Sequence, residues 1–285
     1  MKIKIRETGM RFVFLFSACV SIIAVAFIIA FLLYSGIPAM SEIGFFKFLF
    51  GMIWKPSAGL YGIFPMIVGS ICVTAGAIVF GVPLGLGCAA FLAFFCPAKL
   101  YRVLKPAVEL LAGIPSIVYG FFGLMVIVPV MQTFFGGSGK GILTSSLLLG
   151  FMILPTVINV TESSLRAVPN HYYEGSLALG ATHERSVFRV IFPAAKSGVF
   201  AGIILGIGRA VGETMAVVMV AGNQAIMPES VTSGIRTLTT NIILEMGYAA
   251  ELHREALIAT GVVLFVFILI INLSFSALKR KEERS

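Results

Sequence analysis

The sequence predicts an all-α integral membrane protein with six transmembrane helices. Of its 285 residues, 58% are hydrophobic and only 12% are charged, and a soluble domain of this size cannot bury that much apolar surface. The apolar residues also form six runs near or above the ~20 residues that a bilayer requires. These runs cover approximately residues 12–34, 62–95, 106–131, 142–160, 197–222 and 256–278.

Each run has its own boundary signals. The first follows a basic N-terminus and is too long for the apolar region of a signal peptide, which predicts a retained helix. The second contains Gly81-Val82-Pro83, which predicts a kink or an end of the spanning part. Glu109 opens the third run and is expected to cap its start. Glu162 and Arg166 follow the fourth run four residues apart, the spacing of a surface ion pair.

The distribution of Lys and Arg predicts that both termini are cytoplasmic. With that orientation the cytoplasmic side carries an excess of basic residues, as the positive-inside rule requires: Lys2, Lys4, Arg6, Arg11, Lys99, Arg102, Lys105, Arg166, Arg185, Arg189, Lys196, Lys279, Arg280, Lys281 and Arg284. The opposite side carries Lys47, Lys55, Lys140, Arg236 and Arg254. The net charge of +8 is therefore interpreted as a topology signal and not as a nucleic-acid surface.

Several site classes are excluded by spacing. Gly136–Gly141 resembles a phosphate-binding loop, but Gly141 stands where that motif needs Ser or Thr, and the glycine spacing is broken. The four cysteines form no cluster with metal-ligand spacing. We therefore expect no metal, no cofactor and no nucleotide site in this chain.

The fifth run carries two ionisable residues, Arg209 and Glu213. On a continuous helix they share a face about 80° wide with Gly198, Gly202 and Gly206. Intramembrane charges face a bundle interior or a cavity, and small residues permit close helix packing. This face should therefore meet a partner subunit or a translocation path. Arg209 could bind an oxyanion bidentately, with Glu213 as its partner when the path is empty; the alternative is a static ion pair that joins two subunits.

The segment between the fourth and fifth runs is too long for a simple connection and should have a function. Its residues Glu174, Gly175, Ser176, Gly180 and Pro193 predict two short helices with a turn at Gly180 and a small-residue surface. The segment resembles the EAA loop of ABC importer permeases. In this chain Gly175 and Ser176 stand in place of the two alanines of that motif. The resemblance implies a type I (MetI-like) permease bundle whose cytoplasmic coupling helix is seated in an ATPase subunit.

Two further stretches, "LLAGIPSIVYGFFG" (110–123) and "GRAVGETMAVVMVAGN" (208–223), are similar to the C-type permease of phosphate-specific ABC importers. The resemblance implies a non-catalytic subunit in the plasma membrane of a bacterium or archaeon. Its partners would be a homologous second permease, two ATP-binding cassette subunits, an external phosphate-binding protein, inorganic phosphate and membrane lipid. The expected organisation is a peripheral helix and external loop (1–61), a permease core (62–278) and a basic tail (279–285).

Two alternatives stay open at this point. A permease for another oxyanion, such as molybdate or sulfate, fits the same guanidinium. An ion-coupled secondary transporter could use Arg209 and Glu213 as a proton-coupled pair, although it gives no reason for the loop pattern. A membrane-embedded enzyme is disfavoured because no nucleophile and base, or set of metal ligands, falls at membrane depth.

Overall fold

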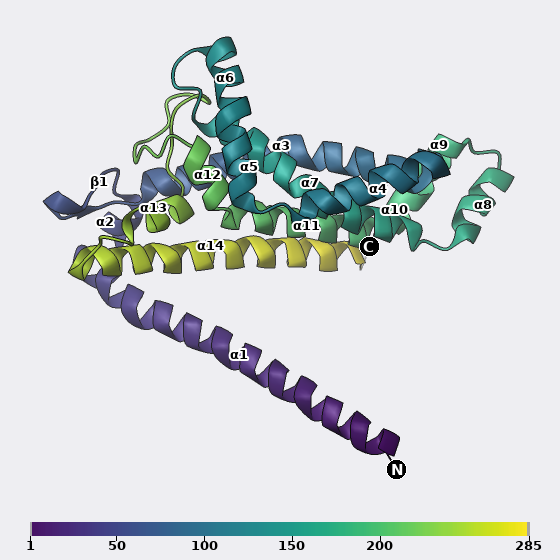
Figure 1. The fold of residues 1–285 in the computed structure, drawn as a ribbon, viewed down its shortest axis with the longest axis horizontal. Coiled ribbons are helices and arrows are strands. Elements are labelled where there is room, and N and C mark those ends of the chain that lie inside the picture. The colour runs from purple at the N-terminus through teal and green to yellow at the C-terminus, as the bar shows by residue number, and fades with distance from the viewer. Residues whose placement is uncertain (1, 284–285) are drawn as a thin grey trace.

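The computed structural model describes residues 2–283, with side chains described for residues 10–274 and 277. The basic residues of 2–9 and 279–285 therefore lie outside the described side chains. Within the described residues the chain is mostly helical (Figure 1). Its α-helices are α1 (Lys2–Ile43), α2 (Phe45–Phe50), α3 (Phe64–Ala90), α4 (Ala98–Gly113), α5 (Ser116–Phe122), α6 (Val128–Phe135), α7 (Ile142–Arg166), α8 (Asn170–Ala178), α9 (His183–Ser186), α10 (Phe192–Ala194), α11 (Lys196–Gly212), α12 (Met215–Val220), α13 (Leu238–Glu245) and α14 (Glu251–Glu283).

Shorter elements complete the chain. Three π-helical stretches extend or join α-helices: η2 (Phe91–Phe95), η3 (Gly123–Ile127) and η4 (Val187–Ile191). The strands β1 (Trp54–Lys55) and β2 (Leu60–Tyr61) pair antiparallel across the 3-10 turn η1 (Pro56–Ala58).

Five helical stretches within the described residues are long and apolar enough to cross a membrane: Met10–Ile43, Phe64–Phe95, Ser116–Phe135, Ile142–Arg166 and Glu251–Ser274. A sixth arises if His183–Ala194 and Lys196–Gly212, bent by 74° against each other, count as one span. The predicted runs 12–34, 62–95, 142–160 and 256–278 correspond to four of these helices, whereas the run 197–222 covers α11 and α12 and does not coincide with the bent pair. The third span begins at Ser116 and not near residue 106, because α4 ends at Gly113 and Ile114 is extended.

The prediction that Glu109 caps the start of a helix is wrong. Glu109 lies near the end of α4, which begins eleven residues earlier at Ala98, directly after Pro97. Its side chain is 58% exposed and pairs with Lys105 one turn back, at 3.6 Å. Pro97 starts the helix and the Gly113–Pro115 stretch ends it, as glycine and proline commonly do.

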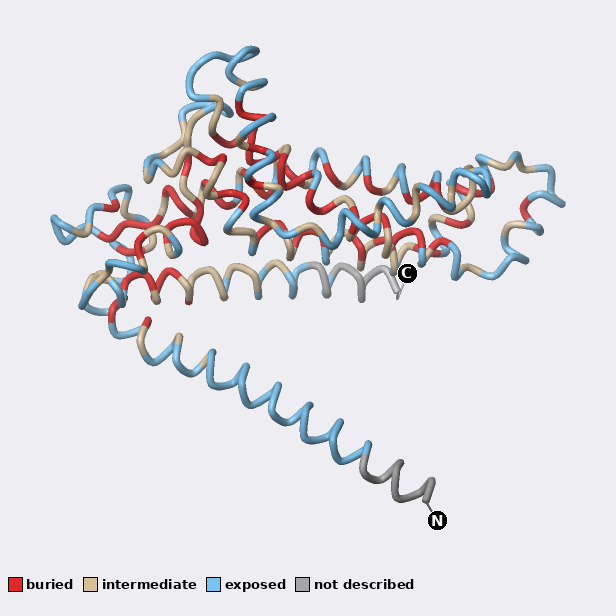
Figure 2. Tube along the Cα trace, viewed as in Figure 1, coloured by how far each residue is buried: buried red, intermediate tan, exposed pale blue. Residues whose placement is uncertain are grey.

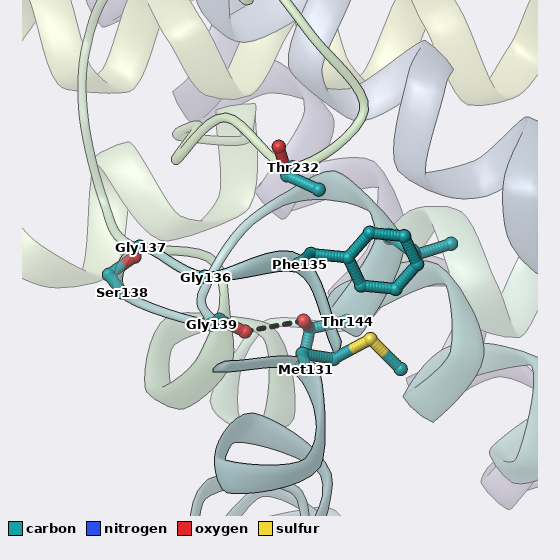
Figure 3. Close-up of a pocket in the computed structure, with 9 residues that line it drawn as sticks. Met131, Phe135, Gly136, Gly137, Ser138, Gly139, Thr144 and Thr232 are labelled. Carbon is teal, nitrogen blue, oxygen red and sulfur yellow. Dashed lines mark hydrogen bonds between the residues drawn. The ribbon is translucent and has the colours of Figure 1, made fainter. Parts of the chain in front are cut away.

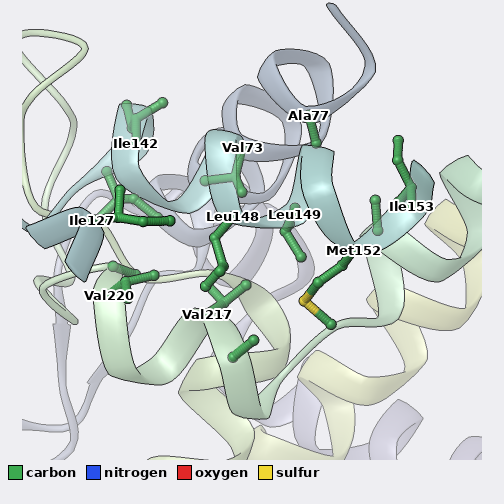
Figure 4. Packing of buried hydrophobic residues seen from close by; sticks show 14 of the residues in the cluster. Val73, Ala77, Ile127, Ile142, Leu148, Leu149, Met152, Ile153, Val217 and Val220 are labelled. Atoms are coloured by element: carbon green, nitrogen blue, oxygen red, sulfur yellow. The ribbon is translucent and has the colours of Figure 1, made fainter. Parts of the chain in front are cut away.

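The centre of the molecule is α7, which packs between α3 and α11. Its buried residues form the main apolar cluster together with α3 and α12, and Figure 4 shows Leu148 and Met152 of α7 beside Val73 and Val217. Buried stretches in Figure 2 lie not only in these helices but also at the end where α13 and the start of α14 meet. Helix α7 is therefore the central helix on which α3 and α11 pack.

The second span does not end at Gly81-Val82-Pro83, which was one of the two outcomes predicted there. Helix α3 continues through Pro83 to Ala90, and the π-helical η2 carries it to Phe95. A Cβ at Gly81 would lie 2.7 Å from Cδ1 of Ile153 and 2.8 Å from the carbonyl oxygen of Gly150 in α7. Gly81 therefore allows close packing against α7, and proline inside a membrane helix is tolerated when neighbouring helices support it.

Most of helix α1 lies away from the bundle. Its side chains are almost all exposed from Met10 to Tyr34, and Figure 2 shows this stretch diverging from the body. It contacts the bundle near its C-terminal end, where Gly36 lies against Ala259 and Val262 of α14. In Figure 1 the first residues of α1 and the end of α14 point toward the end of the molecule that carries α8 and α9, whereas β1, α2 and α13 lie at the opposite end.

Candidate functional site

The predicted fifth span is broken at Glu213. Helix α11 ends at Gly212, Glu213 has an extended backbone (φ −70°, ψ 131°), and α12 begins at Met215. Oε1 of Glu213 accepts a hydrogen bond from the backbone N–H of Ala216 at 3.0 Å. The carboxylate thus satisfies a free N–H group in the first turn of α12, an alternative to continuing the helix.

This break corrects part of the predicted helical face. Because Glu213 is extended, it does not continue the face that carries Gly198, Gly202, Gly206 and Arg209. The three glycines do share one face, but they pack against α7 of the same chain. A Cβ at Gly202 would lie 3.0 Å from Oγ1 of Thr161, and one at Gly206 would lie 2.9 Å from Cγ2 of Val157. The glycine ridge is therefore an internal contact, not a surface for a partner subunit.

Arg209 lies in the last turn of α11, next to the break, and is half-buried. Its Nη1 donates to Oγ1 of Thr156 in α7 at 3.4 Å. The guanidinium is also close enough to Tyr119 in α5 to interact with it electrostatically. The hydroxyl of Tyr119 donates to the backbone oxygen of Leu111 at 2.9 Å and bridges the gap between α4 and α5. Arg209 therefore sits where α5, α7 and α11 approach one another.

The predicted ion pair between Arg209 and Glu213 is not formed in this structure. Among the described side chains, no carboxylate lies within ion-pair distance of Arg209. A guanidinium is permanently charged, and a half-buried one gains much from an anionic partner. The arrangement can therefore accept an anion at Arg209 without first displacing Glu213.

The predicted two-helix element is present between α7 and α11. Helices α8 and α9 are joined by a turn in which Gly180 has φ +84°, a left-handed conformation that favours glycine. Glu174 and Gly175 are exposed on α8, and Pro193 is exposed in α10. Ser176 is instead buried, and its hydroxyl donates to the backbone oxygen of Tyr173 at 2.7 Å.

The element projects beyond the rest of the bundle (Figure 1). Tyr173 of α8 and His183 of α9 are joined by a 2.7 Å hydrogen bond between the hydroxyl and Nδ1, which fixes the two helices to each other. Leu179, beside the turn, is 91% exposed.

A carboxylate whose burial the sequence did not predict lies between α7 and α4. The predicted ion pair between Glu162 and Arg166 is present. It is not a surface pair, however, because Glu162 is only 1% exposed. Its Oε1 accepts from Nε of Arg166 at 2.9 Å and from the hydroxyl of Tyr101 at 2.8 Å, while Oε2 accepts from Nζ of Lys105 at 2.8 Å. The hydrogen bond to Glu162 raises the pKa of the Tyr101 hydroxyl.

These contacts tie α4 to the end of α7. Nη2 of Arg166 also donates to the backbone oxygen of Leu92 in η2 at 2.7 Å. Tyr101 and Lys105 stand four residues apart, so both reach one side of α4. Their spacing is a signal in the sequence, but their partner is 57 to 61 residues away.

The glycine-rich loop that resembles a phosphate-binding motif lines a small pocket of about 90 Å³ (Figure 3). Gly136, Gly137 and Gly139 have positive φ angles, and Oγ1 of Thr144 donates to the backbone oxygen of Gly139. The lining residues of this pocket carry no ionisable side chain: Met131, Phe135, Gly136, Gly137, Ser138, Gly139, Leu143, Thr144 and Thr232. Its surroundings therefore give no support to phosphate binding at this loop.

The long apolar helices of the described residues define an integral membrane protein. Residues 81–284 match the family model described as "Binding-protein-dependent transport system inner membrane component". The chain therefore belongs to this family and is a multi-pass permease subunit of the inner membrane, not an enzyme, as the sequence predicted.

Curated relatives cover most of the chain. It is 38% identical over 242 residues to "Probable ABC transporter permease protein YqgH" of Bacillus subtilis, covering 82% of this chain and 78% of the relative. It is 37% identical over 254 residues to "Phosphate transport system permease protein PstC" of Mesorhizobium japonicum, covering 82% and 77%.

Solved structures show the same fold at lower identity. An inward-facing MetNI methionine ABC transporter matches with a TM-score of 0.62 at 20% identity, covering 81% of this chain and 99% of that one. The predicted MetI-like bundle is thus confirmed.

Proposed function

We propose that this chain is the permease subunit of an ATP-driven importer of inorganic phosphate and forms half of its translocation path. The observation that supports this most directly is Arg209, a half-buried guanidinium with no carboxylate partner among the described side chains, at the meeting point of α5, α7 and α11. Its planar fork of donors matches two oxygens of a phosphate. Several relatives are also named as phosphate permeases.

We assign to Glu213 a role different from that of Arg209. Its carboxylate holds the first turn of α12, so we infer that it positions the break and contributes negative charge near the path. Negative charge beside the cation would weaken phosphate binding and so favour release, which transport requires.

We further propose that α8 to α10 contact an ATPase subunit. Glu174, Gly175 and Pro193 are exposed there, Leu179 is uncovered, and the hydrogen bond between Tyr173 and His183 makes the element rigid. The complete importer would contain a homologous second permease, two ATP-binding cassette subunits and an external phosphate-binding protein. Residues 62–278 would form the permease core, with both chain termini and α8 on the cytoplasmic side.

The decisive experiment is uptake of labelled phosphate into vesicles that contain all subunits, the binding protein and internal ATP. We expect uptake that requires ATP and is not reduced by excess molybdate or sulfate. Uptake of molybdate or sulfate in preference to phosphate would show that phosphate is not the substrate. Uptake without the ATPase subunits would support a secondary transporter instead.

A variant tests the proposed contact with the ATPase in the same system. Glu174→Lys reverses an exposed charge on α8, so less ATPase should co-purify with the permease. Glu229→Lys reverses an exposed charge in the segment before α13 and should leave the co-purified amount unchanged. Equal amounts of ATPase with both variants would contradict the coupling assignment.

A further inference from the structure

A second buried carboxylate lies at the end of the molecule opposite α8. Glu245, the last residue of α13, is 7% exposed. Its Oε2 accepts from Nε1 of Trp54 at 2.8 Å and lies 2.9 Å from Nε2 of His253, and its Oε1 pairs with Nη1 of Arg236. The three partners come from β1, from α14 and from the chain before α13. Breaking such a buried network is costly, so it joins these segments firmly.

Arg236 extends this network to the end of α12. Its Nε donates to the backbone oxygen of Asn223 at 3.1 Å. Asn223 follows α12 with a positive φ of 55°, and its Nδ2 donates to the backbone oxygen of Val218 at 2.8 Å. The backbone N–H of Ile235 also donates to the oxygen of Ala221 at 2.8 Å. The C-terminal end of α12 is therefore held by residues 235 and 236.

The start of α12 is held by the same segment, residues 235–245. Thr239, in the first turn of α13 and 7% exposed, donates from Oγ1 to the backbone oxygen of Glu213 at 3.0 Å. Glu213 in turn accepts the N–H of Ala216. Residues 235–245 thus contact α12 at both ends, and Thr239 contacts the residue at which α11 breaks.

We propose that Thr239 is a positioning residue for transport, through which the segment 235–245 sets the place of Glu213 beside Arg209. This inference rests on the proposed function, because it takes the Arg209 region as the translocation path. A displacement of α13 on the external side moves the backbone of Glu213 through this partly buried hydrogen bond. Arg236 and Glu245 act one step further out, by fixing α13 and the end of α12 to β1 and α14.

The test compares two substitutions in the complete complex with labelled phosphate. Thr239→Val keeps the shape of the side chain and removes the donor, whereas Thr239→Ser keeps the donor. We expect Thr239→Val to lower the maximal uptake rate per assembled complex about fivefold to tenfold, the scale of one buried hydrogen bond. The phosphate concentration at half-maximal uptake should not change, and Thr239→Ser should restore most of the rate.

Thr260→Val is the matched control. Thr260 is fully buried in α14, and its hydroxyl donates to the backbone oxygen of Ala256 in the same helix. This variant removes a buried hydroxyl that has no contact with Glu213, so its rate per complex should equal that of the unmodified protein.

Two results would overturn the inference. One is an unchanged rate per complex for Thr239→Val, and the other is a loss that only follows a smaller amount of assembled complex, since that marks a purely structural role. If the unmodified complex transports molybdate or sulfate and not phosphate, the proposed substrate is wrong. The same variants are then compared with the transported anion, and the same two results decide the positioning role.

Discussion

The carboxylate of Glu213 accepts the backbone N–H of Ala216 at 3.0 Å and leaves Arg209, four residues earlier in the chain, without a carboxylate partner among the described side chains. Two residues with the spacing of a helical ion pair therefore do different things. One holds the start of a short helix, and the other presents a half-buried cation where three helices meet. Their separate roles lead to separate experimental expectations.

Replacing Arg209 should abolish transport without disassembling the complex. Arg209→Ala removes two potential charge-assisted hydrogen bonds to the anion, so we expect uptake to fall roughly a hundredfold. Arg209→Lys should recover little, because an ammonium cannot reproduce the bidentate geometry. Initial rates of labelled phosphate uptake measure the effect. The control is Arg254→Ala, which removes an exposed arginine of α14; near-normal uptake by Arg209→Ala would contradict the path assignment.

Two substitutions of Glu213 distinguish the role of its hydrogen-bond acceptor from the role of its negative charge. Glu213→Gln keeps a side-chain oxygen that can accept the N–H of Ala216, whereas Glu213→Ala leaves that group without its acceptor, at a cost of about 1 kcal/mol. We therefore expect Glu213→Ala to lower the uptake rate about fivefold more than Glu213→Gln. If both variants are equally impaired, the negative charge and not the acceptor is what the site requires.

Substitutions of two glycines in the α8–α9 element test whether its turn is needed for the contact with the ATPase. Gly180 has φ +84°, so Gly180→Ala strains the turn between α8 and α9 by about 1–2 kcal/mol. Gly175 lies within α8, and a Cβ there would meet nothing within 4 Å. Co-purification with the ATPase subunits should decline for Gly180→Ala and persist for Gly175→Ala. The reverse order would show that the small surface of α8, and not the turn, governs the contact.

The stability contributed by Glu245 should depend on pH. Burial raises the pKa of Glu245, but hydrogen bonds from Trp54, Arg236 and His253 outweigh burial and leave the pKa below its usual 4.5. A lowered folded-state pKa means that the stabilisation is present above pH 4.5 and is lost as the pH falls through the folded-state value. The midpoint of thermal unfolding should therefore be higher for the unmodified protein than for Glu245→Gln at pH 7.

The difference between these two midpoints should narrow as the pH falls below 4.5. Glu229→Gln, which changes an exposed glutamate, should match the unmodified protein throughout this range. A constant difference between pH 7 and pH 3 would show that Glu245 stabilises the fold by its shape and not by its charge.

The sequence predicted those features that depend on local patterns. The six apolar runs, the glycine face of α11 and the turn at Gly180 all follow from composition and spacing within a short window. The break at Glu213 was missed because a continuous helix and two short helices give the same apolar pattern. The network around Glu162 was missed because Tyr101 and Lys105 come from a helix about 60 residues away, and apolar periodicity carries no information on such pairings.

The close approach of α3 and α11 to α7 has a mechanical consequence. Where glycine faces a serine, an isoleucine or a valine across these interfaces, no long flexible side chain separates the helices to absorb a displacement. The three helices should therefore move as a solid body. Flexing is then expected at the joint that borders the block, the extended residue Glu213 at the end of α11, so a displacement of one end of the block is transmitted to this joint.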